Sequence, residues 1–242
     1  MSYNDEMIKK INYKDIIILS ALWFMIIAIT TILHQKEFIY NTPLLKGVFN
    51  FLFTLTGRFI FLALAIFYII SLYDLPLKSL HISFHNFKYQ LGQSIIIFSV
   101  FFIFVLFFIN IPLSFNLSSH DFTPLYKITS PLKLVRSLFS LVTIFLASTL
   151  ISLSEQFFIC RLLYSYFSNR LNSFLGIILA SCAYSLILVD LVPLHILIHS
   201  IIGFISIFLY NKSKSLIFPS LFGGFYYAAY IVYIYGWNFY NL

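Results

Sequence analysis

The chain has 242 residues, of which 61% are hydrophobic and only 10% are charged, and its formal net charge is +7. A soluble domain of this size cannot cover so much apolar surface, so the composition indicates an integral membrane protein. The basic residues are spread over several loops, which is typical of topology signals and of attraction to lipid headgroups. We therefore expect membrane lipid as a partner and no binding of nucleic acid.

Seven apolar segments are long enough to cross a hydrocarbon core, which requires about 17–25 helical residues. In chain order they are 16–33, 49–72, 94–113, 138–160, 173–192, 194–210 and 216–236. These runs show no alternation of polar and apolar residues, which a transmembrane barrel would need. The sequence therefore predicts an all-α fold, a polytopic transmembrane helical bundle that forms a single membrane domain over residues 1–242.

The segment 74–93, DLPLKSLHISFHNFKYQLGQ, differs from the spans that flank it. Leucine, isoleucine and phenylalanine alternate there with lysine and histidine. This mixture predicts a short amphipathic helix that lies in the inner headgroup layer. Two roles stay open for it, a lipid-facing connector or a gate on which a partner docks.

The distribution of lysine and arginine predicts the orientation of the chain. With the N-terminus inside, nine basic residues fall on the inner side and five on the outer side, three of those five within 114–137. Cytoplasmic loops carry the excess of lysine and arginine, so we expect a cytoplasmic N-terminus. The first apolar stretch is not followed by a small-residue cleavage site, and we expect no cleavable signal peptide. The expected location is the bacterial plasma membrane.

Ionisable residues within the spans are the candidates for function, because each charge at bilayer depth costs about 2.5–3.5 kcal/mol on insertion scales. The second half of the chain has five of them: Glu155, Arg161, Asp190, His195 and His199. Asp190 and His195 are expected near the outer boundary, and Glu155 and His199 deeper. On a regular helix, side chains six residues apart project about 120° from each other, so Glu155 and Arg161 would not pair.

His195 and His199 are four residues apart and therefore share one helix face. Two such histidines and Glu155 could supply three metal ligands. Histidines in membrane helices more often form hydrogen bonds across helices or to the backbone. Cys160 and Cys182 both lie in apolar segments, which favours buried free thiols over a disulfide. We expect no metal and no other cofactor.

The order of motifs over about 140–232 is similar to that of the CPBP family, the CAAX-processing and bacteriocin-processing intramembrane proteases also called Abi proteins. The stretches that carry this resemblance are SEQFFICRLLYSYFSNRLNSFLGIILASCAYSLIL and PLHILIHSIIGFISIFLYNKSKSLIFPSLFGGFYYAAY. Members of the family have a Glu-Glu-x-x-x-Arg motif, then Phe-x-x-x-His, and finally His-x-x-x-Asn. The resemblance implies a glutamate that polarises a water held by histidines, with an asparagine at the oxyanion.

This chain departs from the family pattern at the positions that handle protons. If Arg161 is aligned with the motif arginine, the two glutamate places hold Gln156 and Phe157. If Glu155 and Gln156 take the place of the glutamate pair, one extra residue separates them from Arg161. A π-bulge can absorb such a residue, and π-bulges occur frequently at functional sites.

The histidine places of the pattern are also replaced. Phe-x-x-x-His appears as Tyr184 followed by Leu188, and His-x-x-x-Asn appears as Gly224 followed by Ala228. Neither a leucine nor a glycine side chain can move a proton. His195 or His199 would have to supply the missing imidazole from a different helix.

Three functions stay open. The first is a catalytically inactive member of the family that binds a membrane partner through small residues, Gly223, Gly224, Ala228 and Ala229, which permit close approach of another helix. The resemblance implies a sensor kinase, a cell-wall enzyme or a bacteriocin-related system as that partner. The second is an active intramembrane endopeptidase of the CAAX-processing type that uses Glu155 with His195 or His199.

The third function is a transporter or channel subunit, against which stands the absence of matched broken helices or a ring of like charges. Glu155 also has a purely structural interpretation. It can be a protonated residue, or a tie to Arg161 or Arg170 near the inner interface. We favour the inactive, partner-binding function, in which the segment LSEQFFICR is the remnant of a catalytic site.

Overall fold

The computed structural model describes residues 11–35, 43–105, 131–188 and 193–235 of the chain. Every element of regular structure in these residues is helical, which confirms the predicted all-α bundle. The elements are α2 (Tyr13–Gln35), α3 (Pro43–Tyr73), η2 (Leu77–Leu80), α4 (Phe87–Val105), α6 (Pro131–Gln156), η5 (Phe157–Tyr164), α7 (Ser165–Arg170), α8 (Ser173–Ile187), α9 (Pro193–Ser213) and α10 (Ile217–Tyr235).

A helix lies at each of the seven positions where the sequence predicts a span. Among the described residues, five helices are long and apolar enough to cross a membrane: Tyr13–Ile32, Phe51–Tyr73, Phe87–Val105, Leu141–Arg170 and His195–Ser213. The apolar helix α8 is shorter, and its 15 residues extend about 22 Å at 1.5 Å per residue. This is less than the roughly 30 Å of the hydrocarbon core. The protein is therefore a multi-pass membrane protein.

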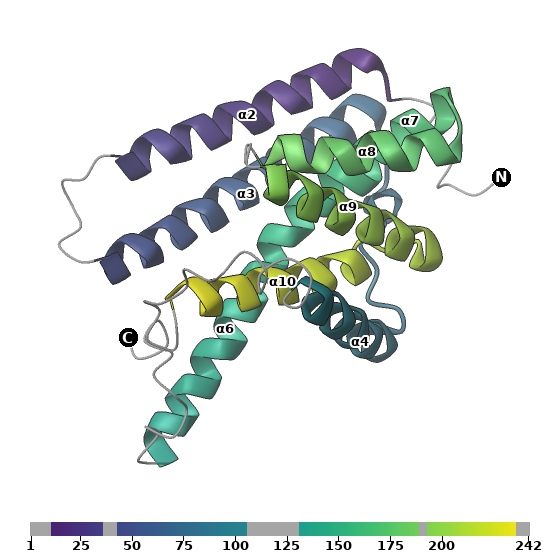
Figure 1. Cartoon of the computed structure of the whole chain (residues 1–242). Coiled ribbons are helices and arrows are strands. Elements are labelled where there is room, and N and C mark those ends of the chain that lie inside the picture. The colour runs from purple at the N-terminus through teal and green to yellow at the C-terminus, as the bar shows by residue number, and fades with distance from the viewer. Residues whose placement is uncertain (1–10, 36–42, 106–130, 189–192, 236–242) are drawn as a thin grey trace.

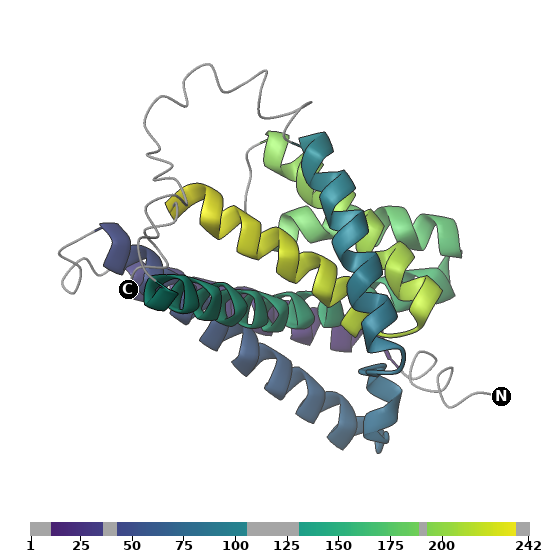
Figure 2. The same ribbon diagram turned by 90° about the horizontal axis from the view of Figure 1, so that it is seen from below.

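The central element of the bundle is the long helix α6 (Figure 1). Its packing partners include α3 on one side and α10 on another, and α10 also contacts α4 and α9. Figure 2 shows α10 lying between α6 and α4. The pairs α2 with α3 and α8 with α9 are packed side by side. Because α3, α4 and α9 pack against α6 and α10, polar residues at the contacts of these two helices are positioned inside the protein.

Proline and asparagine set where several helices begin. Pro43, Pro131 and Pro193 are the first residues of α3, α6 and α9, positions where a missing N–H costs nothing and the fixed φ suits a helix. The side chain of Asn172 caps α8 by accepting a hydrogen bond from the Leu175 N–H at 2.8 Å. These proline and asparagine residues define where the helices begin, independently of the packing of apolar side chains.

The amphipathic helix predicted over 74–93 is not present. The structure has the single 3₁₀ turn η2, an irregular stretch to residue 86, and then the first turns of α4. Asp74, His81 and Asn86 have positive φ values of 50°, 60° and 58°, a conformation that interrupts a right-handed helix. Ser79, Leu80 and His81 are buried, so this connector packs against the bundle.

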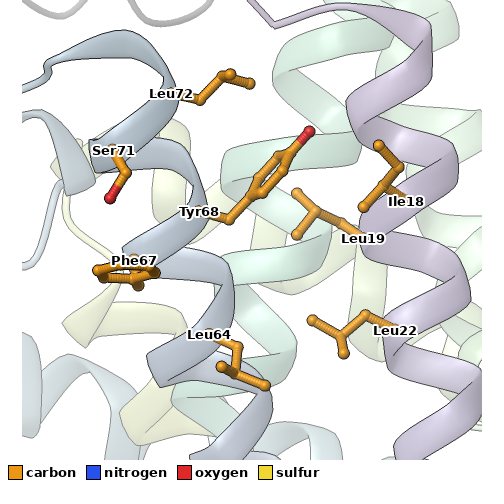
Figure 3. A pocket seen from close by; sticks show the side chains of 8 residues that line it. All are labelled: Ile18, Leu19, Leu22, Leu64, Phe67, Tyr68, Ser71 and Leu72. Carbon is orange, nitrogen blue, oxygen red and sulfur yellow. The ribbon is translucent and has the colours of Figure 1, made fainter.

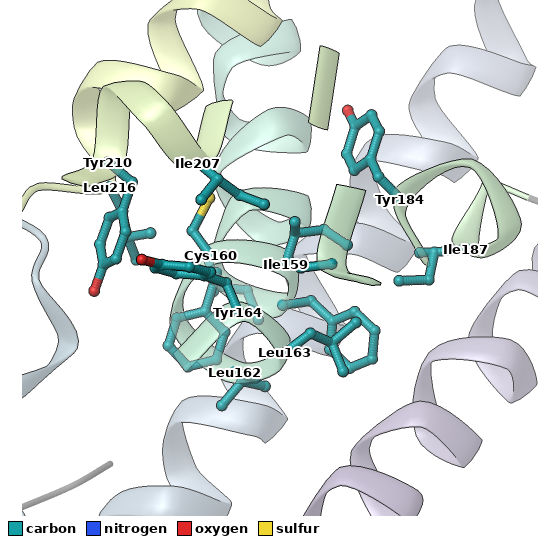
Figure 4. Close-up of a cluster of buried hydrophobic side chains, with 14 of the residues drawn as sticks. Ile159, Cys160, Leu162, Leu163, Tyr164, Tyr184, Ile187, Ile207, Tyr210 and Leu216 are labelled. Carbon is teal, nitrogen blue, oxygen red and sulfur yellow. The ribbon is translucent and has the colours of Figure 1, made fainter. Parts of the chain in front are cut away.

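The segment that follows α6 is a π-helix, η5. The sequence offers a π-bulge here only in the alternative alignment in which Glu155 and Gln156 take the place of the glutamate pair. The Ser165 hydroxyl donates to the Cys160 carbonyl five residues earlier, at 3.1 Å. All eight residues of η5 are buried. Figure 4 shows Ile159, Cys160, Leu162, Leu163 and Tyr164 packed among side chains of α8 and α9. The π-helix is thus enclosed by the C-terminal half of the chain.

Candidate functional site

Glu155 forms a buried ion pair with Arg58. The Nε atom of Arg58 on α3 lies 3.6 Å from Oε1 of Glu155 on α6, and the Glu155 side chain is 1% exposed. An isolated charge at this depth would be costly, and an opposite charge within ion-pair distance offsets part of that cost. The pair therefore joins α3 to α6 in the middle of the bundle.

Two tyrosine hydroxyls complete the surroundings of the carboxylate. Tyr184 on α8 donates to Oε2 of Glu155 at 3.0 Å, and Tyr227 on α10 donates to the same oxygen at 2.7 Å. Hydrogen bonds to an ionised group are stronger than those between neutral groups. Glu155 is therefore held by residues from three other helices, α3, α8 and α10.

Aromatic rings enclose the guanidinium of Arg58. Its Cζ atom lies 3.9 Å from the centroid of the Trp23 ring on α2, a cation–π contact. Trp23 stacks on Phe158 with centroids 5.3 Å apart and meets Phe61 edge to face at 4.7 Å. The Trp23 indole N–H donates to the carbonyl of Ile187 at 3.1 Å. The aromatic cluster fixes the position of Arg58 and connects α2 to the rest of the site.

Arg161 belongs to a separate polar cluster near the connector 74–86. Its Nη2 donates to the Ser79 carbonyl at 2.7 Å, and its Nη1 donates to the Tyr210 hydroxyl at 3.3 Å. The Tyr210 hydroxyl is in turn 2.8 Å from Nδ1 of His81. Tyr210 therefore donates to His81, because its oxygen already accepts from Arg161. Arg161 anchors the connector to the π-helix and has no contact in common with the Glu155 carboxylate.

His81 lies next to two positive charges. Burial, together with the charges of Arg161 and Lys214, lowers the pKa of His81 from 6.5 to about 4. The neutral ring is the form that can accept the Tyr210 hydrogen bond at Nδ1. The cluster is therefore built around an uncharged imidazole.

His199 is connected to the Glu155 carboxylate through Tyr184, and His195 lies next to His199. Their rings are 6.3 Å apart, and the His199 ring meets Tyr184 at 6.3 Å and Tyr226 at 6.4 Å between centroids. Tyr184 is one of the two donors to Glu155. Tyr184 thus contacts both the His199 ring and the Glu155 carboxylate.

The small residues predicted to line a partner groove face the chain's own α6. A Cβ atom added to Gly223 would lie 2.1 Å from Oγ of Ser152, and one added to Gly224 would lie 2.2 Å from Oγ1 of Thr149. Both glycines are buried, and Ala228 is half-buried one turn further along α10. The close approach that the two glycines permit is used by α6 and is not open to another protein.

The described residues contain no cluster of three or more histidine, cysteine, aspartate or glutamate side chains that could hold a metal ion. Cys160 is a free buried thiol, as predicted, and its Sγ lies 3.3 Å from Oε1 of Gln156. Cys182 is also free but exposed on the surface of α8, because its neighbours at i−1 and i+2, Ser181 and Tyr184, take the inward face. Asp190 lies outside the described residues.

Three residues of the site lie outside the predicted set, namely Arg58, Tyr184 and Tyr227. Arg58 had an available signal, since a single arginine within an otherwise apolar span is a functional candidate by depth alone. The tyrosines had no comparable signal, because this chain contains 17 of them. Only their hydrogen bonds to Glu155 distinguish Tyr184 and Tyr227 from the other tyrosines.

No family model, curated protein or solved structure matches this chain. The residues of the site therefore carry the functional argument.

Proposed function

We propose that this protein is a non-proteolytic, CPBP-like protein of the bacterial plasma membrane, with a cytoplasmic N-terminus, that acts by binding another membrane protein. The observation that carries the proposal is that the Glu155 carboxylate is buried and already has polar partners. Arg58 faces one carboxylate oxygen, and two tyrosine hydroxyls donate to the other. A general base must lie within hydrogen-bond reach of the water that it activates, and the Glu155 side chain is only 1% exposed.

The replaced family positions support the same conclusion. Leu188, at the first histidine place, follows the last residue of α8 and is half-buried. Gly224, at the second, packs against Thr149. Neither position offers an imidazole to the carboxylate. The four-helix tie around Glu155 is then a structural element that preserves the shape of the bundle.

The N-terminal half of α6 is the surface that we propose for the partner. Figure 1 shows this part of α6 extending away from the other helices. Large apolar side chains lie exposed there at helical spacing, and Phe139 is 74% exposed; the stripe consists of Val135, Leu138, Phe139, Val142 and Leu146. A transmembrane helix of a sensor kinase, a cell-wall enzyme or a bacteriocin-related protein would pack along this stripe.

The proposal is tested by separating chemistry from binding. The chain is expressed in a bacterial host with a photo-crosslinking residue at position 139 or, as a control, at the exposed position 208 on α9. We expect one stoichiometric crosslinked membrane protein from position 139, none from 208, and loss of the crosslink from position 139 when the neighbouring Leu138 and Val142 of the stripe are changed to Ala. Crosslinking that is equal at both positions would contradict the binding surface.

The chemical arm uses Glu155→Gln. We expect the crosslinked complex to form as in the unmodified chain, and we expect reconstituted protein to cleave neither prenylated nor leader-type peptides before or after the change. Peptide cleavage that disappears in Glu155→Gln would establish the endopeptidase function and overturn the proposal.

A further inference from the structure

Three buried polar atoms around Arg161 have no hydrogen-bond partner within the described part of the chain. They are Nε of Arg161, Oγ of Ser79 and Nε2 of His81, and all three residues are buried. A buried polar group that is left unpaired costs about 1–3 kcal/mol. Three such groups in one cluster therefore indicate a ligand that supplies the missing partners.

The three groups lie on residues that hydrogen bonds join to one another. Nη2 of Arg161 donates to the Ser79 carbonyl at 2.7 Å, and the planar guanidinium directs its Nε–H along the same edge as this bond. The Tyr210 hydroxyl links Nη1 of Arg161 to Nδ1 of His81, at 3.3 Å and 2.8 Å. Because Nδ1 of the uncharged His81 ring accepts, the ring proton is on Nε2. All three groups can therefore donate hydrogen bonds where the connector meets the π-helix.

The guanidinium of Arg161 has no counter-charge among the described residues. The described carboxylates are Asp15, Asp74 and Glu155, and the ion pair that they form is that of Glu155 with Arg58. A buried charge without an opposite charge is strongly destabilising. An anion at this place would offset the cost.

Lys214 adds a second positive charge beside the cluster. It is exposed, and two residues further on the Leu216 N–H donates to the His81 carbonyl at 2.8 Å. The charges that act on His81 are those of Arg161 and Lys214. The connector joins two membrane spans and so lies at a membrane boundary, where lipid phosphates are the abundant anions. The electrostatics of this junction thus favour an anion over a cation.

We propose that the cluster of Arg161, Ser79, His81 and Lys214 binds one phosphate group, supplied either by inorganic phosphate or by a lipid headgroup. A phosphate offers several acceptor oxygens, and arginine is suited to its recognition. The buried donors bind these oxygens, and Lys214 contributes charge from the exposed side. The bound phosphate then holds the connector against η5 and the turn between α9 and α10. This inference does not depend on the partner-binding function.

The apolar groove between α2 and α3 has different chemistry (Figure 3). Its eight lining side chains, among them Leu19, Leu64 and Phe67, are uncharged. A lipid held there would depend on its hydrocarbon chain and not on its phosphate. The test therefore includes a water-soluble phosphate, and it includes a lipid that lacks the phosphate.

The test follows the melting temperature of the purified, delipidated full chain in a neutral detergent by tryptophan fluorescence. The chain is titrated with inorganic phosphate against chloride at constant ionic strength, and with phosphatidic acid against diacylglycerol. We expect a saturable rise with a phosphate-bearing ligand and none with chloride or diacylglycerol, because a ligand of the folded state stabilises it. Tighter binding of phosphatidic acid assigns the lipid headgroup as the source, and equal affinities assign the free anion. A chain that responds to neither phosphate form has donors satisfied by water alone, which overturns the proposal.

Serine variants separate binding from folding. Ser79→Ala should lower the phosphate affinity about tenfold. Without phosphate its melting temperature should be no lower than that of the unmodified chain, since the Ser79 hydroxyl has no partner in the described residues. Ser148→Ala is the matched control, because that serine is also buried and unpartnered and lies on α6; it should leave the affinity unchanged. Equal phosphate affinities of the two variants would contradict the site.

Lysine variants test the charge. One lysine near an anionic surface contributes a factor of about five in affinity. Lys214→Gln should therefore weaken phosphate binding about fivefold, whereas Lys14→Gln, at an exposed lysine of α2, should not change it. Equal effects of the two substitutions would show unspecific attraction to surface charge and would contradict the proposal. Both lysines are exposed, so this comparison stays informative if a buried variant fails to fold.

Discussion

Arg58 and Glu155 are 97 positions apart in the sequence and form an ion pair across 3.6 Å in the centre of the bundle. The pair is the meeting point of the N-terminal helices α2 and α3 with the C-terminal helices α6, α8 and α10. Trp23 and Phe61 pack with Phe158 at the same place. The N-terminal helices are therefore joined to the rest of the protein by charge and by aromatic packing together.

Removal of one partner of this pair should lower the free energy of unfolding far more than removal of both. Arg58→Met leaves a buried carboxylate without its counter-charge, and we expect a loss of about 3–5 kcal/mol in the free energy of unfolding. The double variant Arg58→Met with Glu155→Leu should recover most of that loss, because no charge is left unpaired. Unfolding in mixed micelles, followed by tryptophan fluorescence, measures both. A double variant that loses the sum of the two single losses would show that the pair is not coupled.

The hydroxyls of Tyr184 and Tyr227 should each contribute measurably to the stability of the folded protein. Tyr184→Phe and Tyr227→Phe remove single hydrogen bonds to the Glu155 carboxylate, and we expect a loss of about 1.5–3 kcal/mol for each. Tyr89→Phe is the matched control, since that side chain is exposed on α4, and it should change little. If both buried variants unfold like the control, the hydroxyls do not stabilise the carboxylate.

The close contact between α6 and α10 predicts that one methyl group added at Gly224 lowers the stability of the protein strongly. In Gly224→Ala the new Cβ would lie 2.2 Å from Oγ1 and 2.9 Å from Cα of Thr149, so α10 must shift, at a cost of about 1–3 kcal/mol. The same change at Gly92 meets nothing within 4 Å and should stabilise α4 by about 0.5–1 kcal/mol. The melting temperatures of the two variants in detergent should therefore move in opposite directions. A Gly224→Ala protein as stable as the unmodified chain would mean that the two helices are further apart.

Acid should weaken the contact between the connector 74–86 and the π-helix. Because the pKa of His81 is lowered to about 4 by burial and by Arg161 and Lys214, the unfolded chain binds more protons than the folded one between about pH 6.5 and pH 4. The contribution of His81 to stability is thus present above pH 6.5 and is lost as the pH falls through this window. His81→Gln should flatten the pH dependence of the melting temperature there. The exposed His85 supplies the control His85→Gln, which should keep the slope; a slope that survives in His81→Gln would refute the assignment.

The positions of the spans could be predicted from the sequence because each depends on a local run of apolar residues. The π-helix was only one of the possibilities that the sequence left open, because an extra residue lies between Glu155 and Arg161 only if Glu155 and Gln156 take the place of the family's glutamate pair. The partner of Glu155 could not be predicted, because contacts between distant helices leave no periodic pattern. The region 74–93 was predicted incorrectly. Its mixed composition is that of an amphipathic helix, yet the positive φ values at Asp74, His81 and Asn86 and the hydrogen bond from Arg161 to Ser79 hold it in an irregular conformation.

The π-helix η5 also affects how this chain is aligned with others. One additional residue in a helix shifts every later residue by one position. If Glu155 is aligned with a residue of a regular helix, Arg161 is displaced by one position. If Arg161 is aligned, Glu155 is displaced. A search pattern with a fixed interval between an acidic and a basic residue matches only one of them. A helix that contains such a π-helix superposes on a regular helix along its whole length only when one residue is left out of the comparison.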